Sequence, residues 1–147
     1  THSANLHSGN RCHLGNSCPY WTMGLKVDFS VEETLTNQDC IFCRIASKDI
    51  QANLVEETQH SLAFWDISPR QPIHILVIPK RHHANIAALT NDAPDELLDL
   101  MRLGSKIALE KSAGSFRLSF NTGIEAGQTV FHAHGHITSR TPKEQVA

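Results

Sequence analysis

Three histidines, His132, His134 and His136, alternate with small or apolar residues near the end of the chain. Imidazole is the side chain best suited to acid, base and nucleophilic chemistry near neutral pH. Alternation is the period of a β-strand, so the sequence predicts one strand with all three rings on one face. A strand rises about 3.3 Å per residue, which separates the outer two by roughly 13 Å. One ion or one phosphorus atom cannot engage both ends, so we expect different tasks for the three, with His134 as the reactive centre.

Two alternatives remain for this row of histidines. It could bind a metal ion, or it could be a half-exposed strand without chemistry. A metal-dependent hydrolase would need carboxylates beside the row, and only Glu125 lies close in the sequence. Gly135 interrupts the row, and a glycine within a strand loosens it or lets another backbone approach.

The composition predicts one globular domain with a hydrophobic core. The chain has 147 residues, 40% hydrophobic and 19% charged. Its net charge of −2 offers no electrostatic case for a nucleic acid polymer as partner. Apolar runs such as residues 75–78 are too short to span a bilayer, so no membrane partner is expected. Four cysteines without a signal peptide favour a reducing compartment, and we expect a cytoplasmic protein.

The first part of the chain differs from the rest. Residues 1–22 are rich in Ser, Asn, Gly and His without periodicity, and we expect a disordered extension upstream of the domain. Cys12 and Cys18, with histidines nearby, could bind a metal, although their spacing is not that of a zinc knuckle. Residues 23–38 are polar and are expected to be irregular.

A Cys-x-x-Cys pair opens the domain. Asp39 is expected to cap a short helix over residues 40–46, which carries Cys40 and Cys43. Such a pair is ambiguous between half of a zinc site, a redox motif and coincidence. A thioredoxin-like role is disfavoured because no βαβ pattern follows. A structural zinc would need two further ligands from elsewhere in the chain.

The remaining periodicities predict an α+β fold: an antiparallel, meander-like sheet of about five strands with one long helix and a short N-terminal helix. The sequence places strands at residues 54–56, 61–66, 74–79, 116–121 and along the histidine row. The prolines of 67–72 predict a turn. The long helix should run from about residue 93 to 112, capped by Asp92 and ended by Gly114. The domain should occupy residues 39–139, followed by a short tail over 140–147.

The histidine row resembles the motif of the histidine triad (HIT) family. Phe64-Trp65-Asp66-Ile67-Ser68-Pro69, followed by residues 74–82, is similar to the central segment of that family. The resemblance covers roughly residues 39–139. It implies a nucleotide hydrolase or transferase acting on the α-phosphate, most similar to the nucleoside phosphoramidase branch. It also implies a homodimer and a small nucleotide, favouring adenine or another purine.

The resemblance implies a role for each part of the site. His134 would be the nucleophile that forms a nucleotidyl-histidine intermediate. Donors to the phosphate would be His136, Gln128 and Thr129, with Gly123 and Gly127 allowing close approach of the backbone. Supporting roles fall to His74 and Asn121. Asp66 would hold the two ribose hydroxyls, and the base pocket would be lined by Phe42, Ile45, Phe64, Trp65 and Ile67.

Some family members carry a structural zinc, and the corresponding positions here are Cys40, Cys43, His82 and His132. This is a Cys2His2 set, and it gives His132 a task separate from catalysis. His83 is the rival ligand, although we expect it to be exposed to solvent. No metal is required for the chemistry in this scheme. A dinucleoside polyphosphate hydrolase and a non-catalytic nucleotide-binding protein remain as alternative functions.

Overall fold

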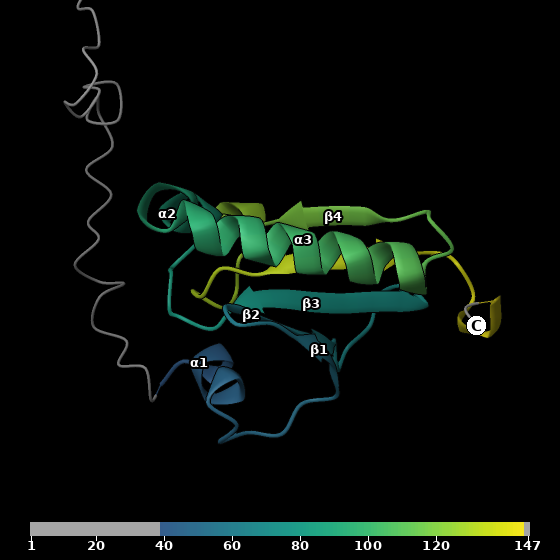
Figure 1. Cartoon of the computed structure of the whole chain (residues 1–147), viewed down its shortest axis with the longest axis horizontal. Coiled ribbons are helices and arrows are strands. Elements are labelled where there is room, and N and C mark those ends of the chain that lie inside the picture. Colours follow the sequence, from purple (N-terminus) through teal and green to yellow (C-terminus); the bar gives the residue numbers. More distant parts are fainter. Residues whose placement is uncertain (1–38, 146–147) are drawn as a thin grey trace, which may run out of the picture.

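Residues 39–145 are described by the computed structural model, and their strands form a single sheet with one long helix across it (Figure 1). The strands are β1 (Leu54–Glu57), β2 (Ser61–Trp65), β3 (Ile73–Pro79), β4 (Arg117–Phe120) and β5 (Gly135–Ser139). The helices are α1 (Ile41–Ala46), α2 (Ile86–Asp92) and α3 (Pro94–Lys111), with two short 3-10 helices, η3 (Ile124–Ala126) and η4 (Lys143–Gln145). The predicted extension and irregular segment before residue 39 lie outside the described residues.

All neighbouring strands are antiparallel, in the order β1-β2-β3-β5-β4. The predicted α+β fold is therefore confirmed, with its five strands, its long helix and its short N-terminal helix. The meander is broken at one point, because the last strand of the chain inserts between β3 and β4. This insertion places β5, which carries His136, between two hydrogen-bonded neighbours in the sheet.

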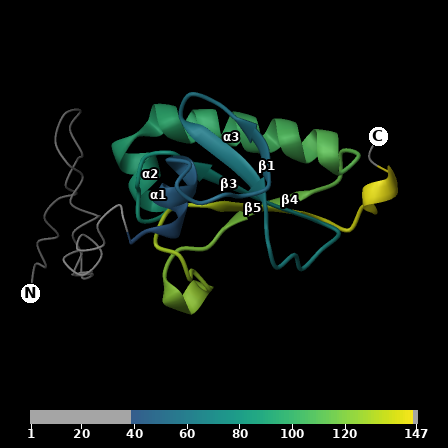
Figure 2. The same cartoon turned by 90° about the horizontal axis from the view of Figure 1, so that it is seen from below.

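Two apolar clusters lie on opposite faces of the sheet, as the two-residue period of a strand requires. In β2, Ala63 and Trp65 contact the cluster under α3, whereas Leu62 and Phe64 belong to the cluster under α1. Figure 2 shows α3 lying along one face of the sheet. Every residue of β3 is buried, and the apolar run of residues 75–78 lies within this strand. Each large side chain so buried contributes about 1.5–3 kcal/mol to folding.

Helix α1 is capped by Cys40 and not by Asp39, so that prediction is wrong. The Cys40 sulfur accepts a hydrogen bond from the backbone N–H of Cys43 at 3.5 Å. Cys40 is buried, because the start of the helix is held against the histidine segment and not left at the surface. Cys40 is thus both the N-cap of α1 and the first cysteine of the Cys-x-x-Cys pair.

The predicted long helix is preceded directly by a second helix, α2. Asn85 caps α2 with a side-chain oxygen that accepts from the backbone N–H of Ala88 at 2.9 Å. Asp92 is the last residue of α2, and Ala93 occupies the N-cap position of α3 without a side-chain bond. The assignment of Asp92 as the cap is therefore wrong, because the residues before it already form a helix.

Strand β5 begins only at Gly135. The prediction that His132 and His134 also lie in this strand is therefore wrong. Next to them, the backbone N–H of Ala133 donates to the carbonyl of His83 at 2.6 Å. That carbonyl belongs to a loop and not to a sheet neighbour, which explains why strand pairing ends there. Of the three histidines in the row, only His136 lies in the sheet, where it pairs with Leu76 on one side and Ser119 on the other.

Gly135 is required by the packing of β4 against it. A Cβ atom at this position would lie 3.0 Å from Leu118 Cδ1 and 3.0 Å from the ring of Phe120. The groups that approach the Gly135 backbone closely are thus the side chains of Leu118 and Phe120, and not another backbone. The volume of the missing side chain is filled from the neighbouring strand.

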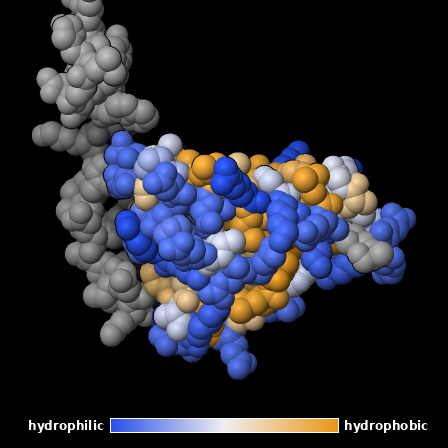
Figure 3. Space-filling view, viewed as in Figure 1, coloured by the Kyte–Doolittle hydropathy of each residue, from blue (hydrophilic) through white to orange (hydrophobic). Residues whose placement is uncertain are grey.

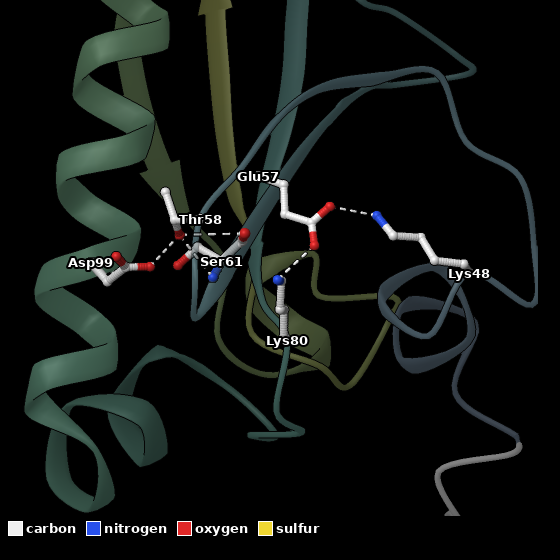
Figure 4. Close-up of polar contacts among 6 residues, drawn as sticks. All are labelled: Lys48, Glu57, Thr58, Ser61, Lys80 and Asp99. Atoms are coloured by element: carbon white, nitrogen blue, oxygen red, sulfur yellow. Dashed lines mark hydrogen bonds and ion pairs between the residues drawn. The ribbon is translucent and has the colours of Figure 1, made fainter.

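The turn between β1 and β2 is tied to three other parts of the fold (Figure 4). Thr58 donates to Asp99 on α3 at 2.5 Å and accepts from the backbone N–H of Ser61 at 3.1 Å. Glu57 pairs with Lys48 and with Lys80, each at 2.6 Å. These contacts fix the hairpin relative to α3 and to the segment that follows β3.

None of the helices within residues 39–145 combines the length and apolar character that crossing a bilayer demands.

Candidate active site and metal centre

The four predicted metal ligands come together from three segments of the chain. Nδ1 of His132 lies 3.4 Å from the sulfurs of both Cys40 and Cys43, and Nδ1 of His82 lies 3.3 Å from the Cys43 sulfur. All four donor atoms lie within 4.8 Å of one another. Tetrahedral zinc, with bonds of about 2.3 Å to sulfur and 2.0 Å to nitrogen, needs a sulfur–nitrogen separation of roughly 3.5 Å. The cluster therefore fits such an ion.

The protonation chemistry of the cluster also fits a metal. Nε2 of His132 lies 2.8 Å from the carbonyl of Pro79, which can only accept, so the proton is on Nε2 and the Nδ1 lone pair faces the thiols. Burial lowers the pKa of His132 to about 4, which favours the neutral ligand form. Burial and then the neighbouring Cys40 raise the pKa of the Cys43 thiol to about 12. Thiolates in this position therefore need a cation to balance them.

His134 is oriented as a nucleophile. Its Nδ1 donates to the carbonyl of His132 at 2.7 Å. A neutral imidazole that donates from Nδ1 keeps its lone pair on Nε2. Burial lowers the pKa of His134, which favours this neutral form. The ring is held edge-on against Phe42, with 5.1 Å between centroids, and the ring of His136 lies 5.0 Å away.

His136 is oriented as a hydrogen-bond donor through a chain of contacts from β3. The backbone N–H of Arg70 donates to Nδ1 of His74 at 3.1 Å, which places the proton of neutral His74 on Nε2. That Nε2 lies 3.1 Å from Nδ1 of His136 and 3.4 Å from Oδ2 of Asp66. His136 thus accepts at Nδ1 and holds its own proton on Nε2. Burial lowers its pKa to about 4, so it can serve as a neutral donor.

The three histidines of the row face two different sets of partners. His132 belongs to the cysteine cluster, whereas His136 shares a second group with Asp66 and His74, whose ligand atoms also lie within 4.8 Å of one another. One ion therefore does not join the whole row. Asp66 is the carboxylate beside the row that sequence proximity alone could not find.

The glycine-rich loop before the row is closed by Gln128. The Gln128 oxygen accepts from the N–H of Gly123 at 2.9 Å, and its amide donates to the carbonyls of Ala84 and Val130 at 2.7 and 3.1 Å. Both amide hydrogens are thus directed to backbone oxygens, so donation from Gln128 to a phosphate would require one of these two hydrogen bonds to break. The hydroxyl of Thr129 lies on an exposed residue and stays available for that task.

Gly127 and Asn121 meet at the end of the same loop. Gly127 has a φ of +91°, in the left-handed region that a side chain would strain. A Cβ built on it would lie 3.6 Å from the amide nitrogen of Asn121. A bare backbone at Gly127 and the amide of Asn121 are therefore side by side at this loop.

Three of the predicted base-pocket residues lie together, and two do not. Phe42, Ile45 and Phe64 are buried in one cluster, and the rings of Phe42 and Phe64 contact edge to face at 5.7 Å. Trp65 lies on the opposite face of the sheet, under Lys143, because adjacent residues of a strand point in opposite directions. This arrangement gives no support to the predicted role of Trp65 in the base pocket. Ile67 is 96% exposed and makes no wall by itself.

His83 is buried, which contradicts the expectation that it faces solvent. Its Nε2 lies 2.7 Å from Glu96 Oε2, and Arg81 lies 3.2 Å from the other oxygen of the same carboxylate. Sequence reasoning missed Glu96 because an acidic residue in the first turn of a helix ordinarily stays in water and faces the helix dipole.

A cleft of about 300 Å³ lies beyond His74 on the sheet. In register, Thr138 sits opposite His74 on one side and Arg117 on the other, so the three share the face that carries His136. The cleft is lined by Gln71, Ser115, Phe116, Arg117, Thr138, Ser139 and Arg140. Its two arginines make this part of the face cationic.

Comparison with known proteins gives consistent results. A family model described as the HIT domain matches residues 47–143. Protein HitA of Neisseria gonorrhoeae is 40% identical over 103 residues, which covers 67% of this chain and 94% of the relative.

Two solved structures extend the comparison. A HIT family hydrolase from Clostridium thermocellum superposes with a TM-score of 0.66 at 35% identity, covering 71% of this chain and 92% of that one. A hypothetical histidine triad nucleotide-binding protein from Sulfolobus tokodaii strain7 has a TM-score of 0.61 at 33% identity, covering 68% of each chain.

Proposed function

Because this chain belongs to the HIT family, we propose that it is a hydrolase acting on the α-phosphate of a small nucleotide, a nucleoside 5′-phosphoramidate or a related compound with a leaving group on that phosphate. The observation that carries the proposal is the orientation of His134. Its Nδ1–H is fixed on the carbonyl of His132, so its Nε2 lone pair is free to attack. The likeness to a HIT family hydrolase and to a histidine triad nucleotide-binding protein supports both the reaction and the ligand class.

The reaction proceeds in two displacements at phosphorus. Nε2 of His134 forms a bond to the phosphorus as the bond to the leaving group breaks, and the leaving group departs with the bonding pair and takes up a proton. Water then attacks the phosphorus, loses a proton, and releases the nucleoside monophosphate and His134. Covalent catalysis of this kind replaces one difficult step with two easier ones.

The phosphate oxygens gain charge during both steps, and donors aimed at them lower the barrier. Nε2–H of His136 and the hydroxyl of Thr129 are the donors of this scheme, with Asn121 in a supporting role next to Gly127. His74 fixes the ring of His136 through the 3.1 Å contact between their nitrogens. Gln128 acts indirectly, by closing the loop from which Thr129 projects.

Zinc would be held by Cys40, Cys43, His82 and His132, and it would cross-link α1, the loop after β3 and the histidine segment. The chemistry at phosphorus does not pass through it. We also propose a homodimer, supported by Leu98 and Leu109 on α3, which are 49% and 55% exposed. Figure 3 shows hydrophobic and hydrophilic surface interleaved on the face that carries this helix. Light scattering would give twice the chain mass.

One assay tests the proposed reaction. The full chain is incubated with adenosine 5′-phosphoramidate, a diadenosine polyphosphate and adenylyl sulfate, and each is followed for release of AMP. We expect the phosphoramidate to be turned over fastest. No AMP from any of the three, together with binding of AMP itself, would favour a non-catalytic nucleotide-binding protein.

A dinucleoside polyphosphate hydrolase is the second candidate, and the cationic cleft favours it. Arg117 and Arg140 lie where phosphates beyond the α-phosphate could extend from His136 and His74. If they bind those phosphates, Arg117→Gln with Arg140→Gln should lower kcat/KM for a diadenosine polyphosphate roughly tenfold or more, since hydrogen bonds to charged groups contribute about 1.5–3 kcal/mol. The phosphoramidate, which has no further phosphate, is the internal control. Equal losses on both substrates would exclude this role for the cleft.

Asp66 gives a separate prediction about the nucleoside. Its Oδ1 accepts from the N–H of Ser68 at 2.8 Å, yet a carboxylate has lone pairs left for ribose hydroxyls. Asp66→Ala should raise KM strongly, because substrate binding would lose about 1.5–3 kcal/mol, the range for hydrogen bonds to a charged group. A 2′-deoxy substrate should be poorer for the wild type but little poorer still for the variant.

The matched control is Asp66→Asn, which can still accept the hydrogen bond from Ser68 but has lost the charge and one acceptor oxygen. It should keep the stability of the wild type and show most of the increase in KM. Equal ribose and deoxyribose kinetics in the wild type would leave Asp66 with only the turn at Ser68 to stabilise.

A further inference from the structure

Glu96 is a buried carboxylate with two cationic or polar partners, far along the chain from the histidine row. It lies in the first turn of α3, where Asp95 beside it is exposed. Its side chain is only 8% exposed, and that of His83 only 5%. A buried carboxylate is costly unless it is paired, so its partners determine what it can do.

The two partners of Glu96 flank a metal ligand. Oε1 lies 3.2 Å from Nε of Arg81, and Oε2 lies 2.7 Å from Nε2 of His83. The residue between these partners is His82, which belongs to the cysteine–histidine cluster. One carboxylate on α3 therefore contacts the residues on both sides of His82, in the interior at His83 and at the surface at Arg81, whose side chain is 69% exposed.

The same loop also holds the histidine segment. The carbonyl of His83 accepts from the N–H of Ala133 at 2.6 Å. Ala133 separates His132, a member of the metal cluster, from His134. A shift of the His83 backbone would therefore move Ala133 and, with it, His132 and His134.

We propose that Glu96 is a positioning residue that sets the metal affinity of the cluster formed by Cys40, Cys43, His82 and His132, and that it ties the histidine segment to α3. The inference rests on the zinc assignment but not on the proposed hydrolysis. Residues outside the ligand shell that orient the ligands typically change metal affinity 10–100-fold when they are removed.

A merely structural ion pair would change stability without changing the metal site, so the experiment must separate the two. Zinc affinity of the full chain is measured by competition with a chromophoric chelator, and exchange of the Ala133 amide is followed by NMR. We expect Glu96→Ala to weaken zinc binding 10–100-fold and to speed exchange at Ala133. Asp95→Ala, which removes a first-turn charge next to it, should leave both unchanged.

A second variant keeps the test decisive if Glu96→Ala fails to fold. Replacing a buried ion pair by apolar side chains of similar volume is often neutral for stability. The double variant His83→Leu with Glu96→Leu should therefore fold and still show the weaker zinc binding and the faster exchange. A folded double variant with wild-type zinc affinity and wild-type protection of Ala133 would overturn the proposal, whether or not the protein hydrolyses nucleotides.

Discussion

Replacing His134 by alanine should lower the turnover of a nucleoside phosphoramidate by roughly four to six powers of ten, because removing a covalent nucleophile costs an enzyme about that much. The fold should survive. The ring contributes one hydrogen bond, to the carbonyl of His132, and an edge contact with Phe42 at 5.1 Å. Binding of AMP should also survive, since Phe42, Phe64 and Asp66 stay in place.

Two measurements check this expectation. Intact-mass spectra after rapid quenching should show a nucleotidyl adduct on the wild type and none on the variant. His60→Ala is the control for loss of a histidine elsewhere, and it should keep both turnover and adduct. Phosphoramidate hydrolysis by His134→Ala at a rate near that of the wild type would remove His134 from the role of nucleophile.

The second large effect concerns the metal cluster. Cys43→Ala removes one of four ligands and should abolish tight zinc binding, which elemental analysis would detect as the loss of about one zinc per chain. At free zinc about a thousand times Kd, the ion stabilises the fold by about 4 kcal/mol. For a domain of this size that corresponds to a fall in Tm of roughly 15–25 °C.

The control is His60→Ala, which removes an imidazole outside the cluster of four ligands and should keep both zinc and Tm. A chelator gives the complementary test. If it lowers Tm while the protein that stays folded keeps its turnover, the ion is structural. Loss of turnover without loss of Tm would point instead to a catalytic ion at Asp66, His74 and His136.

Periodicity and turn residues were sufficient to predict the fold class, because strands and helices bury residues at different spacings. The metal ligands could be named in advance only through the family resemblance, since the four residues come from three distant segments. The structure brought them within reach of one ion.

Other features depend on tertiary contacts that no local pattern contains. His83 is buried because Glu96 reaches it from α3, and His134 leaves the strand because Ala133 bonds to a loop carbonyl. The tautomer of His74 depends on a backbone N–H, that of Arg70, which every residue except proline could supply. The placement of Trp65 is different, because strand alternation by itself puts it on the face opposite Phe64.

The cluster also has a kinetic meaning. Cys40 and His132 are separated by 92 positions, and His132 lies just before β5, the last strand of the chain, which pairs with both β3 and β4. The four ligands meet only when the histidine segment has reached the sheet, so we expect the ion to act after the rate-limiting step of folding. An interaction that is absent from the transition state acts on the unfolding rate. We therefore expect the metal to leave the folding rate almost unchanged and to slow unfolding. Each folded molecule would then persist longer before it opens.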